Sequence, residues 1–457
     1  MAVWSEINCS KINRFGRSDA EYYQPSNQNL YDKLINANPE KLKTMAFITD
    51  GIHASPDIVT ENGVRYISAK CVRDNSFIID NCIFISKHQN DLNLRTQLKK
   101  HDVIITTVGT IGNVAVVNEE IIPSNCDRHV GIIRVSNNSD ISPYYISTFL
   151  NSKYGRFQSL RESAGNVQLN LYISNIGKIL IPRFGNEERT IAKITQTAYE
   201  KRELSKSLYI QAQELLNREL GLNNSQSEMT SNRYESSFCE LMDSRRFDSE
   251  YYNPKVKQIV KRISSKKHSI IKKHFHIKNG FPWNSKKFLD DNSGVPVIRI
   301  RDVKPTYIDN DVLSSIETKY CKAISFPKGQ KSDIVIGMDG LKYFYAALIE
   351  EPCSINQRVC HLTPRQNSNI SSEYATFMIN SEIGQAQLLR DMTIATTVGR
   401  ITNRDIAKLI LPIVSDDFHN SITNLIRKSI NAKKQSKQLL EQAKRRVEEL
   451  IEQAVRK

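Results

Sequence analysis

The chain has 457 residues, more than one hydrophobic core normally supports, and its apolar content of 39% suits two to four folded domains. The eight cysteines contain no Cys-x-x-Cys pair, which argues against a zinc site. No window of eighteen residues is entirely apolar, which argues against a membrane span. The N-terminus has no apolar core of a signal peptide, which argues against secretion, and free thiols then favour the cytoplasm. The formal net charge is +15, of which residues 229–457 carry +13. A basic surface suggests a polyanionic partner, but by itself the charge is explained equally well by solubility.

A near-identical heptapeptide occurs twice, as DAEYYQP at 19–25 and as DSEYYNP at 248–254. Other segments repeat in the same order: DVIITTVGTIGNVAVV (102–117) with DIVIGMDGLKYFYAAL (333–348), YISTFLNSKYG (145–155) with YATFMINSEIG (374–384), and NIGKILIP (175–182) with DIAKLILP (405–412). The offset stays between 229 and 231 residues, which indicates a tandem duplication. We expect the tyrosines of each heptapeptide to pack, and Pro25 and Pro254 each to start a helix.

The first part of each copy has mixed character. Short β-branched runs broken by Gly, Asn and Asp, such as DVIITTVG and HVGIIRV, predict strands and turns. Stretches such as 143–160 predict helices between them. Each copy therefore begins with a domain of about 165 residues that combines helices and strands, and the fold class is α+β.

The second part of each copy predicts one long helix. Apolar and small residues recur there at alternating three- and four-residue steps, which is typical of a coiled-coil seam. The seam positions are Ile191, Ile194, Ala198, Ser205, Leu208, Ala212 and Leu215 in the first helix, and Ile422, Leu425, Ser429, Ala432, Ser436, Leu439 and Ala443 in the second. The alternative is an amphipathic helix that lies on its own domain, but about 35 residues is longer than such a cover needs. If a pseudo-two-fold axis relates the copies, the helices pack antiparallel and a domain lies at each end.

These patterns predict six segments. They are an N-terminal leader (1–18), a first domain (19–183), a central helix (184–222), a polar linker (223–247), a second domain (248–414) and a C-terminal helix (415–457).

No catalytic motif stands out: a phosphate-binding loop, a dinucleotide fingerprint and His-Glu-x-x-His are all absent, and no metal ligands are nominated. Polar loop clusters instead occupy matching places in the two copies. Their Asn, Gln, Thr, Arg and Lys side chains are of the kinds that read base edges and hold phosphates, although ordinary turn chemistry explains part of them. The candidate DNA contacts are Lys70, Arg73, Thr107, Thr110, Asn113, Asn125, Arg128, His129 and Gln168 in the first copy, and Lys286, Lys287, Arg299, Arg301, Lys342, Gln357, Arg358 and Arg400 in the second.

At these residues the chain resembles the specificity subunit of type I restriction–modification systems. TDGIHASP (49–56), NCDRHV (125–130) and QLNLYISNIGKILIP (168–182) before a long helix are similar to that family's target-recognition domain and spacer helix. NGFPWNSKKF (279–288), INQRV (355–359) and TTVGRITNRDIAKLILP (396–412) follow the same order in the second copy. The resemblance implies two target-recognition domains separated by two long antiparallel coiled-coil helices.

The resemblance also implies a non-catalytic subunit for double-stranded DNA. Each domain would read one half of a bipartite site, and the helices would dock two methyltransferase subunits and set the gap. Restriction/translocase subunits would complete the complex, and S-adenosylmethionine, ATP and Mg would be bound by these partners. Two alternatives stay open: a self-contained DNA methyltransferase or nuclease with its own recognition domains, or the recognition subunit of a related phage-defence system.

Overall fold

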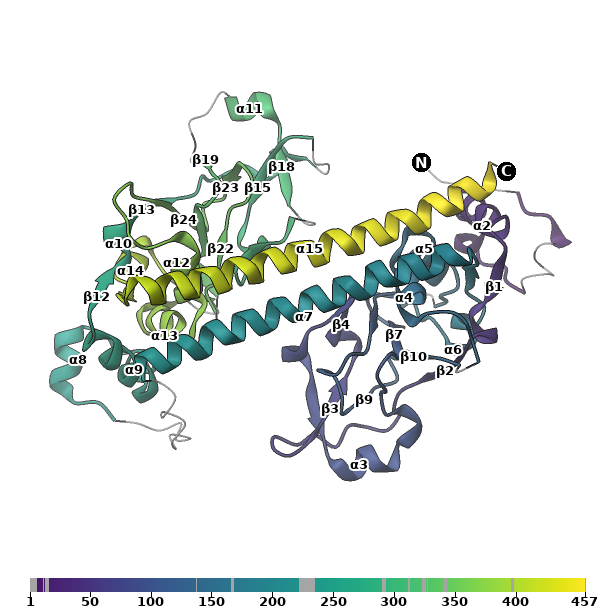
Figure 1. The fold of residues 1–457 in the computed structure, drawn as a ribbon, viewed down its shortest axis with the longest axis horizontal. Helices are drawn as coiled ribbons and strands as arrows, with labels where there is room; N and C mark the ends of the chain where they lie inside the picture. The colour runs from purple at the N-terminus through teal and green to yellow at the C-terminus, as the bar shows by residue number, and fades with distance from the viewer. Residues whose placement is uncertain are drawn as a thin grey trace. The chain divides into compact units, whose positions relative to one another are not determined.

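The computed structural model describes residues 6–10, 12, 16–136, 138–165, 168–221, 235–289, 293–310, 313–322, 326, 328–340, 343–395 and 398–456. The chain divides into two compact units, of which unit 1 comprises residues 1–202 and 434–457 and unit 2 comprises residues 203–433. The division passes through both long helices, so each unit contains a segment of each helix (Figure 1).

Unit 1 is built around a four-stranded antiparallel sheet in the order β2-β10-β7-β8. A second sheet, β6-β3-β9, contains the parallel pair β3 and β9, and the short pairs β1-β11 and β4-β5 complete the strands. The strands are β1 (Pro39–Lys41), β2 (Ala46–Asp50), β3 (Val64–Ile67), β4 (Val72–Arg73), β5 (Ser76–Phe77), β6 (Ile83–Ile85), β7 (Val103–Thr106), β8 (Val114–Val116), β9 (Ser124–Cys126), β10 (Val130–Val135) and β11 (Leu180–Pro182). The helices are α2 (Pro25–Ile35), α3 (Lys87–Leu92), α4 (Pro143–Asn151), α5 (Lys153–Arg161) and α6 (Ile173–Ile176).

Strand β7 is buried on both faces, which explains why its sequence is a continuous apolar run. Val103 and Ile105 belong to the core that contains Phe149 of α4. Ile104, which points to the opposite face because side chains alternate along a strand, belongs to a second core with Cys71. The four-stranded sheet therefore separates two hydrophobic cores.

Unit 2 repeats the core of this topology and adds strands to it, including the three-stranded sheet β21-β26-β25. Its four-stranded sheet has the order β13-β24-β20-β22, and its second sheet, β14-β18-β15-β23-β19, contains the parallel pair β15 and β23. The strands are β12 (His268–Ile270), β13 (Phe275–Asn279), β14 (Phe288–Leu289), β15 (Val295–Ile298), β16 (Val303–Lys304), β17 (Tyr307–Ile308), β18 (Ser314–Ile316), β19 (Lys328–Gly329), β20 (Ile334–Gly337), β21 (Asp339–Gly340), β22 (Ala346–Leu348), β23 (Cys353–Ile355), β24 (Val359–Pro364), β25 (Thr393–Ala395), β26 (Val398–Arg400) and β27 (Ile410–Pro412). The helices are α8 (Phe238–Ser244), α9 (Pro254–Ser264), α10 (Ile271–His274), α11 (Thr318–Lys322), α12 (Ser372–Asn380), α13 (Glu382–Asp391) and α14 (Asn403–Ala407). The predicted duplication is thus present in the fold.

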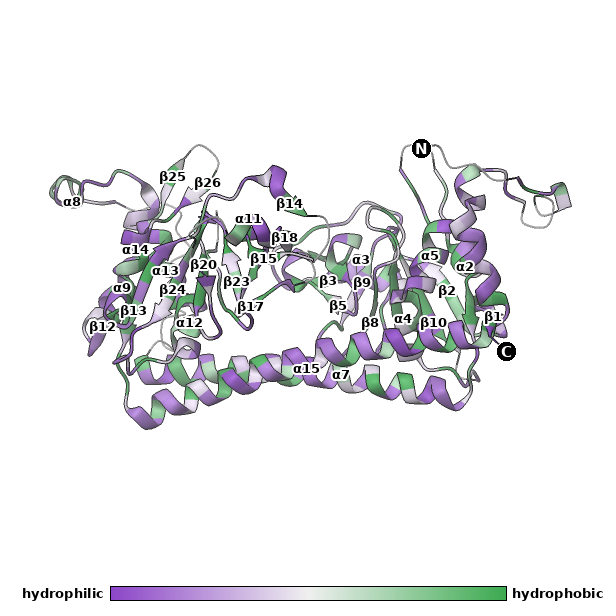
Figure 2. Cartoon of the chain, turned by 90° about the horizontal axis from the view of Figure 1, so that it is seen from above, coloured by the Kyte–Doolittle hydropathy of each residue, from purple (hydrophilic) through white to green (hydrophobic). Residues whose placement is uncertain are grey.

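The two long helices are α7 (Asn186–Leu220) and α15 (Asp416–Val455), and hydrophobic residues alternate with hydrophilic ones along both (Figure 2). In unit 1, Ser436 Oγ donates to the carbonyl oxygen of Ala198 at 2.6 Å, and Arg446 pairs with Glu187 at 3.1 Å. From Ser436 to Arg446 the residue numbers of α15 increase, whereas those of their partners on α7 decrease from Ala198 to Glu187. The helices are therefore antiparallel, as predicted. In unit 2, Ser429 Oγ donates to the carbonyl oxygen of Ser205 at 2.7 Å. Side chains bonded directly to the facing backbone place the two helices very close together.

Larger residues anchor each helix segment to its unit. Val447 and Ile451 of α15 are fully buried in the core of unit 1. Leu216 of α7 and Ile422 of α15 are buried in the same way in unit 2. The helix pair is therefore part of the hydrophobic core of each unit.

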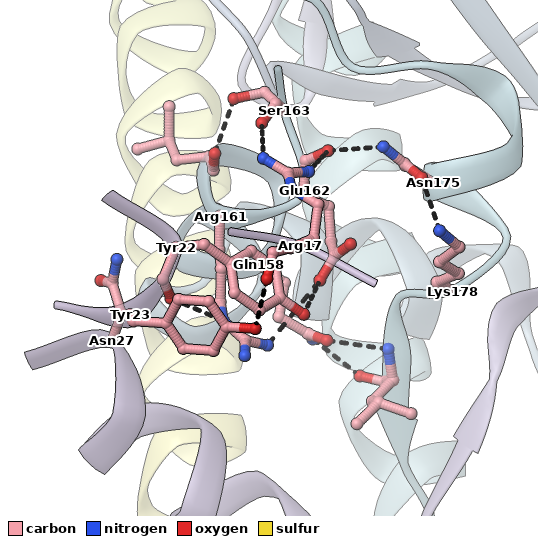
Figure 3. A network of polar contacts seen from close by, with 12 residues as sticks. Arg17, Tyr22, Tyr23, Asn27, Gln158, Arg161, Glu162, Ser163, Asn175 and Lys178 are labelled. Atoms are coloured by element: carbon pink, nitrogen blue, oxygen red, sulfur yellow. Dashed lines mark hydrogen bonds and ion pairs between the residues drawn. The ribbon is translucent and has the colours of Figure 1, made fainter. Parts of the chain in front are cut away.

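The first heptapeptide and Arg17 form a network of polar contacts just before the start of α2 in the chain (Figure 3). We call the contacts of Arg17, Asp19 and Tyr23 the clasp of unit 1. The Arg17 guanidinium binds the Asp19 carboxylate at 2.6 Å and donates to the carbonyl oxygen of Ser163 at 3.0 Å. The hydrogen bond from Arg17 lowers the pKa of Asp19. Tyr23, which is buried, donates its hydroxyl to the carbonyl oxygen of Arg17 at 2.8 Å. The clasp ties the segment before α2 to the chain that follows α5.

The second heptapeptide repeats the clasp in front of α9. Arg246 binds Asp248 at 2.5 Å and donates to the carbonyl oxygen of Met392 at 2.6 Å, and Tyr252 donates to the carbonyl oxygen of Arg246 at 2.6 Å. Helices α2 and α9 begin at Pro25 and Pro254, as the sequence predicts. The heptapeptide is therefore a structural element that each unit needs once.

Parts of the predicted central helix, linker and leader lie outside the described residues: residue 222 of the central helix, 223–234 of the linker, and 1–5, 11 and 13–15 of the leader. The second half of the predicted linker contains helix α8. Within the described part of the chain, no helix combines the length and the apolar character needed to cross a membrane.

Candidate functional site

Five loops of unit 1 meet at one end of its four-stranded sheet. Backbone hydrogen bonds join them: Thr107 N to His129 O at 3.0 Å, Leu171 N to Thr107 O at 2.9 Å, Ile52 N to Cys126 O at 2.8 Å and Asp127 N to Ile67 O at 3.0 Å. We name this surface the loop edge of unit 1, formed by residues 51–53, 68–73, 107–113, 127–129 and the described residues of 164–171.

The loop edge of unit 2 has the same backbone connections. Met338 N bonds to Arg358 O at 3.0 Å, Ile401 N to Met338 O at 3.0 Å, Phe281 N to Ile355 O at 2.8 Å and Asn356 N to Ile298 O at 2.9 Å. It is formed by residues 280–283, 299–302, 356–358 and the described residues of 338–345 and 393–401. In Figure 2 its β25–β26 hairpin lies on the side of unit 2 away from the helix segments.

One glycine in each unit permits this meeting of loops. A Cβ at Gly51 would lie 2.2 Å from the carbonyl oxygen of Cys126, and a Cβ at Gly280 would lie 2.0 Å from that of Asn356. Both distances are far below van der Waals contact, so no other residue fits there without moving the backbone. The sequence motifs TDG and KNG therefore mark a close approach between two loops.

In unit 1 several candidates lie exposed along or beside the loop edge. Lys70, Arg73, Thr110, Arg128 and Gln168 are exposed. Arg73 donates to its neighbour's carbonyl oxygen on Val72 at 2.8 Å, whereas the Arg128 side chain has no hydrogen bond or ion pair among the described residues. His129 is half-exposed, and its Nδ1 lies 3.0 Å from the Asp127 carboxylate, which leaves Nε2 available.

Three candidates in unit 1 are buried, and we remove them from the set of proposed DNA contacts. The Asn125 side chain is 0% exposed: its amide donates to Asn90 at 3.2 Å and its oxygen accepts from Cys126 N at 2.9 Å. Asn113 donates to the carbonyl oxygen of Val72 at 3.2 Å, and Thr107 is also buried. These side chains fix loops from the inside, because a buried amide needs partners within the protein.

In unit 2, Arg299 and Arg301 surround a buried carboxylate. Asp302 is fully buried, accepts a hydrogen bond from Arg299 N at 2.8 Å and pairs with Arg301 Nε at 3.3 Å, and burial raises its pKa. The Arg299 guanidinium is half-buried over the Phe288 ring, 5.1 Å from its centroid, while Arg301 is exposed. In unit 1 the same turn contains Cys71 in place of the aspartate.

The other candidates of unit 2 that the structure describes divide into two groups. Gln357, Arg358 and Arg400 are exposed on the loop edge. Lys286 and Lys287 are exposed on the short 3-10 helix Ser285–Lys287, which begins two residues beyond that edge. Lys342 lies outside the described residues.

The loop edges also contain residues that were not nominated from the sequence. Asp339 pairs with both Arg358 and Arg400, at 3.8 and 3.5 Å. Tyr343 is 55% exposed and stacks on Tyr345, with ring centroids 5.6 Å apart. Beside the loop edge of unit 1, Asp50 binds His53 at 2.6 Å and Arg95 at 3.5 Å. A tyrosine in a polar loop is the one feature of the sequence that could have nominated Tyr343. The pairings of Asp339 and Asp50 cannot be read from the sequence, because they depend on which loops meet.

The described residues contain no cluster of three His, Cys, Asp or Glu side chains that could hold a metal ion. The loop edges present exposed cations, amides and an aromatic ring on loops that buried side chains hold in place. Such a surface can bind an extended anionic ligand and distinguish the hydrogen-bonding groups of that ligand.

Comparison with known proteins identifies this arrangement. A family model for the type I restriction modification DNA specificity domain matches the chain twice, at residues 46–214 and 266–444. Each match includes one loop edge and most of the long helix that follows it, α7 in the first match and α15 in the second.

A curated relative is the type I restriction enzyme EcoBI specificity subunit of Escherichia coli, which is 30% identical over 142 residues, or 30% of this chain. The match spans 27% of that relative's length. Two solved structures are similar along most of their length. The type I restriction-modification system S subunit from M. genitalium is 15% identical, with 91% of this chain and 95% of that chain covered and a TM-score of 0.42. The HsdS subunit from Thermoanaerobacter tengcongensis is 13% identical, with 91% and 96% covered and a TM-score of 0.28.

Proposed function

Because this chain belongs to the family of type I restriction modification DNA specificity domains, we propose that it is the DNA-recognition subunit of such a complex. Each loop edge reads one half of a bipartite site in double-stranded DNA. The helices α7 and α15 dock two methyltransferase subunits and set the gap between the halves. The subunit works in the cytoplasm and performs no chemistry itself.

The observation that carries this proposal is the repeated loop edge with changed side chains. The backbone bond from Thr107 N to His129 O recurs as Met338 N to Arg358 O, and the residue after Thr107 is Val108 in unit 1 but Asp339 in unit 2. Two equal frames that present different hydrogen-bonding groups suit the reading of two different base sequences.

The chemistry of the complex belongs to its partners in this proposal. Methyltransferase subunits would bind S-adenosylmethionine, and restriction/translocase subunits would bind ATP and Mg. The basic charge of the chain supports contact with DNA phosphates, because each neutralised phosphate releases a counterion.

The test is a selection experiment. The tagged chain is purified from its host with its bound subunits and is used to select from a randomised double-stranded DNA library. We expect a motif of two short specified halves around an unspecified gap. Exchange of residues 19–183 for the corresponding domain of a relative should change one half only. A motif that changes in both halves, or no motif at all, would contradict the proposal.

The same preparation addresses the enzymatic alternative. The chain freed of other subunits is incubated with DNA and either S-adenosylmethionine or Mg²⁺. We expect neither methylation nor cleavage, whereas either product from the isolated chain would assign the chemistry to this protein.

A further inference from the structure

Three charged side chains converge at the loop edge of unit 2. Asp339 lies on β21 and directly opposite Arg400 of β26 in the antiparallel register, while Arg358 comes from the turn between β23 and β24. Each carboxylate oxygen of Asp339 lies near one of the two arginines: Oδ1 lies 3.5 Å from Arg400 Nε, and Oδ2 lies 3.8 Å from Arg358 Nε.

The contact atoms matter because Nε is the inner nitrogen of a guanidinium. Neither Arg358 nor Arg400 has another side-chain hydrogen bond or ion pair among the described residues, so the terminal nitrogens of both remain available. The Asp339 side chain is 21% exposed, whereas those of Arg358 and Arg400 are 48% and 46% exposed. The carboxylate thus lies beneath two guanidinium groups that project from the protein.

Stability alone does not account for this arrangement. Ion pairs at these distances between exposed side chains contribute little, because solvent screens them and the long side chains lose rotamer freedom. Two like charges also gather around a single carboxylate, which leaves the cluster with a net positive charge.

Resting on the proposed function, we infer that Asp339 is a positioning residue that orients Arg358 and Arg400 toward guanine bases in the half-site read by unit 2. The terminal nitrogens of arginine form a fork that matches the O6 and N7 acceptors of guanine in the major groove. A carboxylate at Nε restricts rotation of the guanidinium and so prepares the fork before DNA binds. Unit 1 has Val108 at this position, so the two half-sites are read by different chemistry.

The experiment repeats the library selection with the full complex that contains Asp339→Asn. In the wild-type motif we expect guanine at one or two positions of the half-site that is unaffected by exchange of residues 19–183. In Asp339→Asn the preference for guanine at those positions should fall by about tenfold. The other half-site and the midpoint of thermal unfolding should not change, and Asp339→Glu should restore most of the preference.

Glu382→Gln is the matched control, because it removes a carboxylate paired with Lys255 at 2.8 Å on α13. It should leave both half-sites intact. Intact guanine preference in Asp339→Asn, or a loss spread over both half-sites, overturns the inference while the proposed function stands. If Asp339→Asn relaxes a position that Arg358→Lys and Arg400→Lys both leave intact, Asp339 itself reads a cytosine and the positioning role is wrong. A wild-type complex that selects no motif overturns the proposed function itself.

Discussion

The hydroxyl of Tyr23 donates a hydrogen bond to the backbone carbonyl of Arg17 at 2.8 Å, and its counterpart Tyr252 donates one to Arg246 at 2.6 Å. Each tyrosine bonds back to the arginine six positions earlier, and that arginine is also bound by the aspartate two positions after it. Each unit thus has its own clasp directly before the helix that starts at the proline of its heptapeptide, α2 in unit 1 and α9 in unit 2, which explains why the heptapeptide occurs twice.

Removal of one clasp hydroxyl should weaken only its own unit. Tyr23→Phe leaves the carbonyl oxygen of Arg17 without this donor, and we expect the free energy of unfolding of unit 1 to fall by about 1 kcal/mol. Tyr252→Phe should do the same for unit 2. Calorimetry that resolves the two units measures both effects. Tyr251→Phe is the control, because the Tyr251 hydroxyl has no hydrogen bond among the described residues; an equal loss there would show that the hydrogen bond is irrelevant.

Much of the fold can be predicted from the sequence because a repeat supplies two readings of the same pattern. The run around Val103 predicts a strand, and both this run and its counterpart around Ile334 form buried strands. The seam pattern predicts that the two helices pair, and a pseudo-two-fold repeat makes them antiparallel; the contacts of Ser436 with Ala198 and of Arg446 with Glu187 confirm both. The seam does not reveal that Val447 and Ile451 enter the core of unit 1, because that depends on which domain surface each helix meets.

The site is less predictable from sequence because residue type does not determine direction. Asn125 and Gln357 are both polar amides near corresponding turns, yet Asn125 lies on strand β9 and is 0% exposed, whereas Gln357 lies in the turn between β23 and β24 and is exposed. The difference arises from strand β9, which directs Asn125 toward Asn90. The role of Asp339 is hidden for a similar reason, since its partners come from segments 19 and 61 residues later in the chain.

The small residues of the helix seam should tolerate no enlargement. Ser436 in unit 1 and Ser429 in unit 2 are buried and touch the facing backbone, so leucine at either position must push the helices apart. We expect Ser436→Leu and Ser429→Leu each to lower the free energy of unfolding of its own unit by about 1–3 kcal/mol. Ser207→Leu, at an exposed position of α7, is the control, and denaturant unfolding is the measurement. Equal effects of all three would contradict close approach.

Stability at acid pH should depend on Glu452 near the end of α15. Hydrogen bonds from Lys33 and Tyr154 lower the pKa of this carboxyl from its ordinary value of 4.5 to about 2. A lowered pKa stabilises the folded state above the ordinary value, and that contribution is lost as pH falls from about 4.5 toward 2. Glu452→Gln should therefore be less stable than wild type at pH 7, by about 1 kcal/mol or less because the group is partly exposed, and the difference should vanish at low pH. Glu449→Gln, which removes an exposed carboxylate from the same helix, is the control for the loss of a negative charge at pH 7.

Loss of Arg128 should weaken DNA binding in one of two recognisable ways. If Arg128 contacts a phosphate, Arg128→Ala should weaken binding to all sequences and reduce the salt slope by about one charge. If it reads a base, the loss should be about 1–3 kcal/mol and confined to one position of the motif. Arg189→Ala removes the same charge from an exposed position on α7 and is the control. Binding by Arg128→Ala that equals the control would exclude Arg128 from the interface.

The helices should act as a ruler for the gap between half-sites. The two units divide α7 after Arg202 and α15 after Lys433, so four residues inserted at both points leave the helix contacts within each unit intact. The insertion adds about 6 Å and a net rotation of about 40°. DNA rises about 3.4 Å and turns about 34–36° per base pair, so one added base pair matches the rotation and two come closer to the length.

We therefore expect the double insertion to select the same half-sites with a gap longer by one base pair, since rotation decides which face of the DNA each loop edge meets. An insertion in α7 alone is the control: it shifts one helix against the other, breaks the seam in one unit and should lower the unfolding temperature. The library selection described above measures the gap. A double insertion that folds and still selects the original gap would mean that the helices join the two units without measuring the DNA.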